Sequence, residues 1–205
     1  RKDIRVKDTV VVERAGDVIP HVVSVDVEKR QTDSKKFFFP KKCPCGFETI
    51  KEFNKDTKKF DAVRRCPDRG FECDRMAKER LKHFVSKDAL TIEGFGKKIV
   101  ESFWDLNLIR LPQDIFKLNF AKIENLDGWG RQSAANLKYS INLRKTISFE
   151  KFIYALGIRH IGLENAKLLS KNLKSLKNFM LLMKKKILVI CLILMELVKL
   201  KLIQL

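Results

Sequence analysis

The chain has 205 residues, enough for one large domain or for two or three small ones. Lysine and arginine number 43 against 25 acidic residues, so the net charge is +18, while hydrophobic residues make up 45% and are enough to form buried cores. This charge favours nucleic acid or an anionic membrane surface as a partner and makes an ordinary solvated surface a poor explanation.

Residues 8–27 predict a β-hairpin. Valines alternate with other residues before and after Ala15-Gly16-Asp17, which supplies a glycine turn. Two strands cannot bury a core alone, so either a partner is missing or these are the last strands of a barrel. A polar connector at 31–36 and the run Phe37-Phe38-Phe39-Pro40 then lead to a group of cysteines.

Four of the five cysteines predict a metal site. Between Cys43, Cys45, Cys66 and Cys73 lie one, twenty and six residues. Two pairs joined by a short ribbon are typical of a tetrahedral zinc site, and a chain without a secretory signal favours metal over disulfides. A zinc knuckle normally has two or more residues between its cysteines, so a set of free thiols is the alternative. Cys191 stands apart as an apolar residue.

A glycine–hydrophobe–glycine pattern organises the second half. It occurs as Gly94-Phe95-Gly96 and Gly128-Trp129-Gly130, with a looser copy at Ile161-Gly162, and Gly130 follows Gly96 by 34 residues and precedes Gly162 by 32. Small residues that allow close helix packing stand four positions after these glycines: Val100, Ala134 and Ala166.

Each copy predicts two helices joined by a hairpin. The first amides of the second helix and the positive end of its dipole would bind an anion, and a DNA backbone is the expected one. The predicted contacts are the amides around Gly94–Gly96, Gly128–Gly130 and Gly162, backed by Lys97, Lys98 and Arg131. The alternative is an ordinary turn between packed helices, with Phe95 and Trp129 as plugs that fill the hairpins.

Helical periodicity begins at residue 74. Ala77, Leu81, Phe84 and Val85 share one face, and Ser148 is the expected N-cap of a helix buried through Phe149, Phe152, Ile153 and Leu156. His21, His83 and His160 have no acid or nucleophile at an informative spacing, so we interpret them as surface or packing residues.

The end of the chain changes character. Residues 187–195 are nine consecutive apolar residues, whereas a membrane span needs about twenty. Glu196, Lys199 and Lys201 interrupt any longer span. We expect residues 181–205 to be an apolar tail outside the fold, and no membrane association.

Several motifs together resemble bacterial NAD-dependent DNA ligases. They are Arg14-Ala15-Gly16-Asp17-Val18-Ile19-Pro20, the four cysteines, Leu81-Lys82-His83-Phe84-Val85-Ser86, Ile92-Glu93-Gly94-Phe95-Gly96 and Tyr154-Ala155-Leu156-Gly157-Ile158-Arg159. The resemblance implies a multidomain, mainly α chain: C-terminal strands of an incomplete OB fold at 1–36, a four-cysteine zinc finger at 37–73 and a helix-hairpin-helix DNA-binding domain at 74–180. It also implies that Arg14, Val18 and Ile19 lie against the DNA minor groove, and that the hairpins hold phosphates without reading bases.

The resemblance assigns no catalytic residue to this chain. The family's nucleophilic lysine lies in a Lys-x-Asp-Gly motif of the adenylation domain, whereas Asn125-Leu126-Asp127-Gly128 has asparagine in its place. We therefore expect the non-catalytic, DNA-binding portion of a ligase that seals nicks during replication and repair, with NAD and magnesium acting only through the adenylation domain.

The expected partners are nicked or duplex DNA, bound without sequence preference, and a separate adenylation-domain polypeptide. The expected cofactor is zinc, and the expected state is a monomer at the nucleoid of the bacterial cytoplasm. Two alternatives remain: a stand-alone helix-hairpin-helix DNA-binding protein, and a non-functional product of a truncated or frame-shifted ligase gene.

Overall fold

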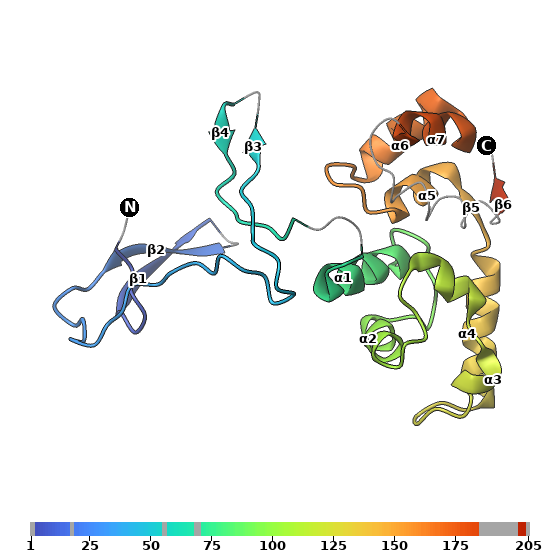
Figure 1. Cartoon of the computed structure of the whole chain (residues 1–205), viewed down its shortest axis with the longest axis horizontal. Helices are drawn as coiled ribbons and strands as arrows, with labels where there is room; N and C mark the ends of the chain where they lie inside the picture. The colour runs from blue at the N-terminus through green and yellow to red at the C-terminus, as the bar shows by residue number, and fades with distance from the viewer. Residues whose placement is uncertain (1–2, 17–18, 55–56, 68–70, 185–200, 204–205) are drawn as a thin grey trace. The chain divides into compact units, whose positions relative to one another are not determined.

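The computed structural model describes residues 3–16, 19–54, 57–67, 71–184 and 201–203. The chain divides into two compact units, Arg1–Arg65 and Cys66–Leu205 (Figure 1). Strands and loops make up the first unit, and helices dominate the second.

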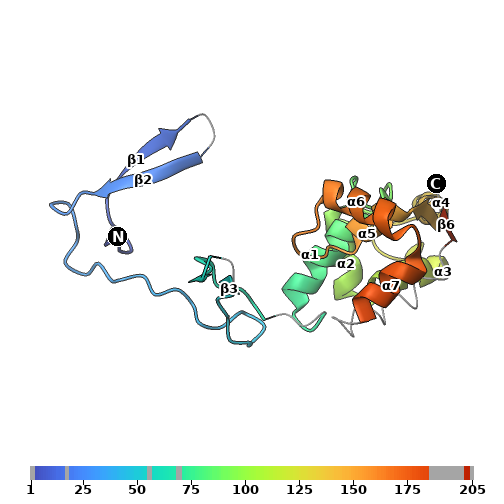
Figure 2. The same cartoon turned by 90° about the horizontal axis from the view of Figure 1, so that it is seen from above.

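The first unit begins with the predicted hairpin. Strands β1 (Val10–Ala15) and β2 (Ile19–Val25) pair antiparallel, as Figure 2 shows, with a register shift between Val11 and Val12. Gly16 in the connecting turn has φ +66°, a conformation that glycine adopts without steric cost. Among the side chains described in these two strands none is buried, which agrees with the expectation that two strands form no core of their own.

A polar cluster ties the ends of this hairpin together. The side chain of Asp8 has no exposed surface, and its carboxylate accepts hydrogen bonds from Nε and Nη2 of Arg30, both at 2.9 Å. It also accepts from the Arg5 amide at 2.8 Å and from Ser34 Oγ at 3.1 Å. These bonds lower the pKa of Asp8 to about 2, and the hydrogen bond from Arg30 has the largest effect. Charge-assisted hydrogen bonds thus fix this segment where apolar burial does not.

The rest of the first unit is a narrow ribbon. Two-residue strands β3 (Phe53–Asn54) and β4 (Lys59–Phe60) pair antiparallel, and isolated bridges join Lys42 to Glu48 and Ile50 to Arg65. This ribbon connects the second cysteine to the third.

The second unit is a helical domain with a single hydrophobic core. Its elements are α1 (Asp74–Val85), α2 (Lys97–Asp105), the 3₁₀-helix η1 (Pro112–Lys117), α3 (Phe120–Ile123), α4 (Arg131–Leu143), β5 (Thr146–Ser148), α5 (Phe149–Ala155), α6 (Leu163–Leu173), α7 (Leu176–Lys184) and β6 (Lys201–Ile203). Helix α5 packs on α6 and on α1, and α6 packs on α7 (Figures 1 and 2).

Helix α1 forms as its apolar periodicity predicts. The four residues of the predicted face, Ala77, Leu81, Phe84 and Val85, are the buried residues of this helix. Its opposite face is tied to α2 by ion pairs from Lys78 to Asp105 and from Lys82 to Glu101. The helix ends at Ser86, whose extended backbone breaks the helical geometry.

Small residues bring the hairpin helices into close contact with the core. Val100, Ala134 and Ala166 are 0%, 2% and 0% exposed on α2, α4 and α6. Phe84, Phe103 and Phe152 are among the largest fully buried side chains around them. The small residues that the sequence predicts to allow close helix packing are thus buried.

The end of the chain differs from the sequence expectation. Helix α7 continues past residue 181 to Lys184, with Phe179 and Met183 buried, and β6 pairs in parallel with β5. The apolar run at 187–195 and Cys191 lie outside the described residues. Within the part of the chain that the structure describes, no helix has the length and apolarity to cross a membrane.

Two local predictions need correction. Ser148 occupies the N-cap position of α5, but its side chain makes no capping hydrogen bond. Leu156 is only half-buried at the C-cap, and Ala155 is buried in its place, because the helix ends at that residue.

Candidate metal centre and anion-binding hairpins

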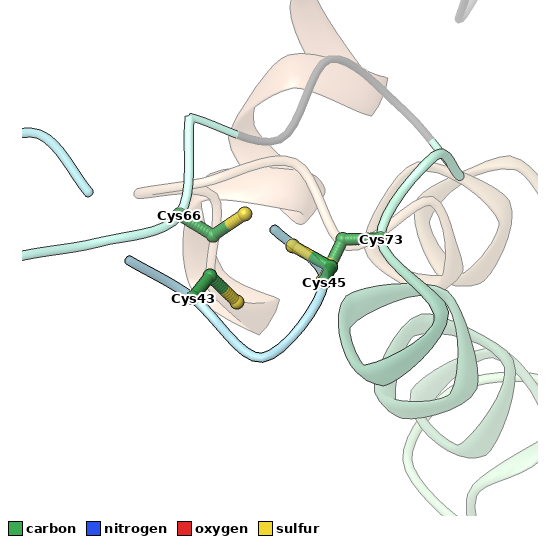
Figure 3. Close-up of side chains that lie close together, drawn as sticks. All are labelled: Cys43, Cys45, Cys66 and Cys73. Carbon is green, nitrogen blue, oxygen red and sulfur yellow. The ribbon is translucent and has the colours of Figure 1, made fainter. Parts of the chain in front are cut away.

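Four thiols gather at one point of the structure. The sulfur atoms of Cys43, Cys45, Cys66 and Cys73 all lie within 4.8 Å of one another, and Figure 3 shows them grouped together. Four thiolates held tetrahedrally at about 2.3 Å from a zinc ion would be about 3.8 Å apart. The cluster therefore needs little adjustment to hold a metal ion.

The short spacing of the first pair does not keep its thiols apart. The Gly46 amide donates to the Cys43 carbonyl and the Cys43 amide donates to the Phe47 carbonyl, both at 2.8 Å. Gly46 closes this turn with φ +92°, a value that disfavours any residue with a Cβ. Pro44 alone thus suffices between the two ligands.

The other pair approaches helix α1. Cys73 is fully buried and occupies the N-cap position of α1, while Cys66 is half-buried. The fourth thiol of the cluster is thus fixed to the start of the first helix of the second unit.

The three predicted hairpins share one hydrogen-bond pattern. The amides of Phe95, Trp129 and Ile161 each donate to the carbonyl three residues earlier, at 3.2, 3.0 and 3.0 Å. The carbonyls of Gly96, Gly130 and Gly162 each accept from the amide four residues later, at 3.1, 3.0 and 2.9 Å. The repeat inferred from the sequence is therefore a repeat of structure.

The residue two positions before each of these glycines has a left-handed backbone. It has φ +76° at Gly94, φ +73° at Gly128 and φ +66° at His160. The sequence pattern of paired glycines does not include His160, because the third hairpin has histidine where the other two have glycine. The same 34- and 32-residue offsets, counted from Gly94, point to His160.

The hydrophobic residue of each hairpin faces inward. Phe95 is buried, and its ring centroid lies 5.6 Å from that of Phe103. Trp129 is half-buried against the same core, 5.4 Å from Phe103. Phe95 thus fills its hairpin as a plug, and the half-buried Trp129 packs its ring against the same core.

The outer surface of the hairpins is open to solvent. Gly94, Gly96, Gly128 and Gly162 are exposed, Gly130 is half-exposed, and the side chains of Lys97, Lys98 and Arg131 are exposed at the starts of α2 and α4. Among the described residues, no protein group accepts a hydrogen bond from the backbone amides of Lys97, Lys98, Arg131 and Gln132. These amides are free to bind an anion.

The third hairpin carries different charges. Its helix α6 begins with Leu163 and Glu164, and the Glu164 carboxylate pairs with Lys167 at 2.8 Å. The cation on the turn before this helix is instead Arg159, which precedes the exposed His160. Its electrostatic attraction for an anion is therefore weaker than that of the first two.

The residues that the resemblance places against the minor groove lie in the first unit. Arg14 pairs with Pro20 and Ala15 with Ile19 beside the β1–β2 turn, and the side chains of Arg14 and Ile19 are exposed. Val18 lies outside the described residues.

The histidines other than His160 have no catalytic surroundings among the described residues. His83 Nε2 lies 2.8 Å from the Tyr154 carbonyl oxygen and its ring packs edge-on against that of Tyr154, so it is a packing residue. His21 is exposed on β2.

Known proteins match this chain along most of its length. Residues 1–34 match the NAD-dependent DNA ligase OB-fold domain, and residues 151–191 match the helix-hairpin-helix motif. The DNA ligase of Pelagibacter ubique (strain HTCC1062) is 68% identical over 180 residues, which are 87% of this chain and 27% of that protein.

More distant relatives cover the same region. The DNA ligases of Xanthobacter autotrophicus and Azorhizobium caulinodans are each 49% identical, over 84% and 85% of this chain and 25% and 24% of their own lengths. The chain thus spans about a quarter of the length of the curated relatives that it matches.

Proposed function

Since this chain belongs to the NAD-dependent DNA ligase family, we propose that it is the part of such a ligase that grips duplex DNA around a nick. Its hairpins would hold the phosphate backbone without reading bases. The nick-sealing chemistry, which uses NAD and magnesium, would belong to an adenylation domain outside this sequence.

One observation carries this proposal: the fold does not require glycine at the second glycine of each hairpin. Gly96, Gly130 and Gly162 have φ of −75°, −156° and −79°, which other residues adopt readily. A Cβ added at any of the three would meet no atom of the chain within 4 Å. Glycine at these positions is explained by something outside the chain that approaches the backbone closely.

The chemistry of that approaching group follows from the free amides and exposed cations. Gly96 precedes Lys97 and Lys98, and Gly130 precedes Arg131, at the starts of two helices of nine and thirteen residues. Amide donors, a positive helix end and a flexible cation together suit a phosphate. Contacts of this kind carry no base readout, so the binding would be independent of sequence.

The four-cysteine cluster would hold zinc. Four thiolates are the donor set of structural zinc sites, and a site without a position for water has no catalytic role. Cys43, Cys45, Cys66 and Cys73 would fix the ribbon and the start of α1. On β1 and β2, Arg14, Val18 and Ile19 would contact the minor groove.

The test is binding of the whole chain to a fluorescent blunt duplex, measured by anisotropy at increasing salt. With two phosphates per hairpin, about six contacts lower the affinity roughly 10³-fold between 50 and 200 mM salt. The triple variant Gly96→Ala/Gly130→Ala/Gly162→Ala should bind about tenfold more weakly, which corresponds to about 1.4 kcal/mol.

The matched control is Asn142→Ala, an exposed position at the far end of α4 from Gly130, which should bind as the wild type does. Circular dichroism should show equal helix content in all three proteins. Affinity that does not change with salt, or a triple variant that binds with wild-type affinity, would contradict the proposal.

A further inference from the structure

A second basic surface lies far from the hairpins in the sequence. Residues 35–42, Lys35-Lys36-Phe37-Phe38-Phe39-Pro40-Lys41-Lys42, carry four lysines and no carboxylate, and we call them the aromatic strap. All eight side chains are exposed. Phe38 and Phe39 are 81% and 76% exposed, an unusual state for consecutive aromatic residues.

The strap is held at both ends. At its start the Val6 amide donates to the Lys35 carbonyl at 3.1 Å, and the buried Ser34 donates from Oγ to the Val6 carbonyl at 2.9 Å. At its end the Lys41 carbonyl accepts from the amide of Thr49 at 2.6 Å and from its Oγ at 2.8 Å. The exposed rings therefore lie on an anchored segment.

The rings border an open cavity of about 720 Å³, whose other wall is the segment 3–6. Phe37 and Phe39 pack edge-to-face with ring centroids 5.0 Å apart, so this pair is preorganised. Lys36 and Arg5 also line the cavity. The carboxylate that lines it, Asp3, is engaged by Arg5 at 3.0 Å and by Arg30 at 3.2 Å. The cavity thus combines aromatic faces with a positive rim.

We propose that the aromatic strap binds single-stranded nucleic acid. The lysines on both sides of the rings take phosphates, and Phe38 with the Phe37–Phe39 pair stacks on unpaired bases. Every base has a π-face, so this binding is independent of sequence. This role differs from that of the hairpins, which would bind the backbone of a duplex. The strap would instead bind the unpaired bases of a gap or a frayed end.

The charge pattern favours nucleic acid over the other occupants of an exposed apolar surface. A second copy of this basic chain would bring four more lysines to the strap and would be repelled. An anionic membrane would also attract lysine and phenylalanine. However, the edge-to-face ring pair and the open cavity suit a flat base, whereas insertion into a bilayer requires neither.

The test compares a fluorescent oligothymidine with a blunt duplex, both bound by the whole chain and measured by anisotropy. Phe38→Leu keeps an apolar side chain and removes the aromatic face. It should weaken binding of the single strand about tenfold and leave binding of the duplex unchanged. The matched control is Phe60→Leu, because Phe60 on β4 is 65% exposed and follows Lys58 and Lys59 but lies outside the strap.

A second measurement does not depend on a variant. An oligonucleotide that carries 5-iodouracil should crosslink on irradiation to the peptide that contains Phe37–Phe39, identified by mass spectrometry. A crosslink only elsewhere, or equal single-strand affinity of Phe38→Leu and the wild type, overturns the proposal.

Two further outcomes would also overturn it. One is that the wild type binds phosphatidylserine vesicles more tightly than oligothymidine and that Phe38→Leu loses the vesicle binding. The other is that the wild type is a dimer that Phe38→Leu dissociates. The hairpins are tested separately by the duplex. If the proposal for the strap is wrong, the wild type still binds the duplex in a salt-dependent way. If the proposal for the hairpins is wrong, the effect of Phe38→Leu on single-strand binding is still observed.

Discussion

At the scale of single residues, the glycines of the helical unit fall into two groups with different physical roles. Gly94, Gly128 and Gly157 have positive φ, a backbone conformation that favours glycine. Gly96, Gly130 and Gly162 have neither a positive φ nor a close neighbour. Stability measurements should therefore separate the two groups.

We predict effects of different size for two exposed glycines that lie five residues apart. Gly157→Ala forces alanine to φ +61° and places its Cβ 3.2 Å from the ring of His83, so it should destabilise the helical unit by about 2 kcal/mol. Gly162→Ala should cost less than about 1 kcal/mol, because φ −79° suits alanine and its lower freedom in the unfolded chain offsets the preference of an N-cap for glycine. Urea denaturation followed by circular dichroism measures both, and equal losses in the two variants would show that this division of the glycines is wrong.

At the scale of elements, the sequence predicted the features whose residues recur at a regular spacing. The face of α1, the β1–β2 hairpin and the inward residues Val100, Ala134 and Ala166 all follow from repeated spacing of apolar or small residues. The β5–β6 pairing could not be predicted, because each strand has three residues and the partners lie far apart in the sequence. For the site, the sequence identified the cysteines and glycines by residue type and missed His160, because only the spacing of the repeat, and not its residue type, points to that position.

The β1–β2 element should depend on pH through Asp8. Its pKa of about 2 lies below the ordinary aspartate value of 3.8, so ionised Asp8 stabilises the folded form at all pH values well above 3.8. That contribution is lost as the pH falls from about 4 to about 2. Carbon-13 NMR of the Asp8 carboxyl should give the low pKa, and the amide signals of residues 3–36 should lose dispersion over the same range.

Asp8→Asn should show that loss of dispersion already at neutral pH. Asp33→Asn is the control, since the Asp33 carboxylate pairs with Lys7 on the surface, where both side chains are about 60% exposed. A normal titration of Asp8 would contradict the proposed role of the Arg30 pair.

At the scale of the whole molecule, the four cysteines link residues that are far apart in the chain. Cys43 and Cys73 are separated by the entire β3–β4 ribbon, so a metal ion would close a long loop and reduce the entropy of the unfolded chain. The core of the second unit begins at Cys73, and we expect the metal to stabilise the start of α1.

We predict about one zinc ion per chain, measured by inductively coupled plasma mass spectrometry on protein purified without added metal. Removal by a chelator should lower the thermal midpoint and make four thiols reactive. Cys73→Ser should abolish zinc binding, and Cys191→Ser should leave it unchanged. Native protein without zinc, in which all four thiols react freely with a thiol reagent, would favour the free-thiol alternative.

The left-handed backbone at His160 has a consequence for how the third hairpin can change. A histidine codon differs from every glycine codon at two or more bases, and on the two-base routes the single-base intermediates encode aspartate or arginine. Aspartate tolerates a positive φ but would bring a negative group to an anion-binding turn, whereas arginine would bring a positive group but strain the backbone. Conversion of this hairpin to the form of the other two would therefore pass through a variant that is inferior either in binding or in folding.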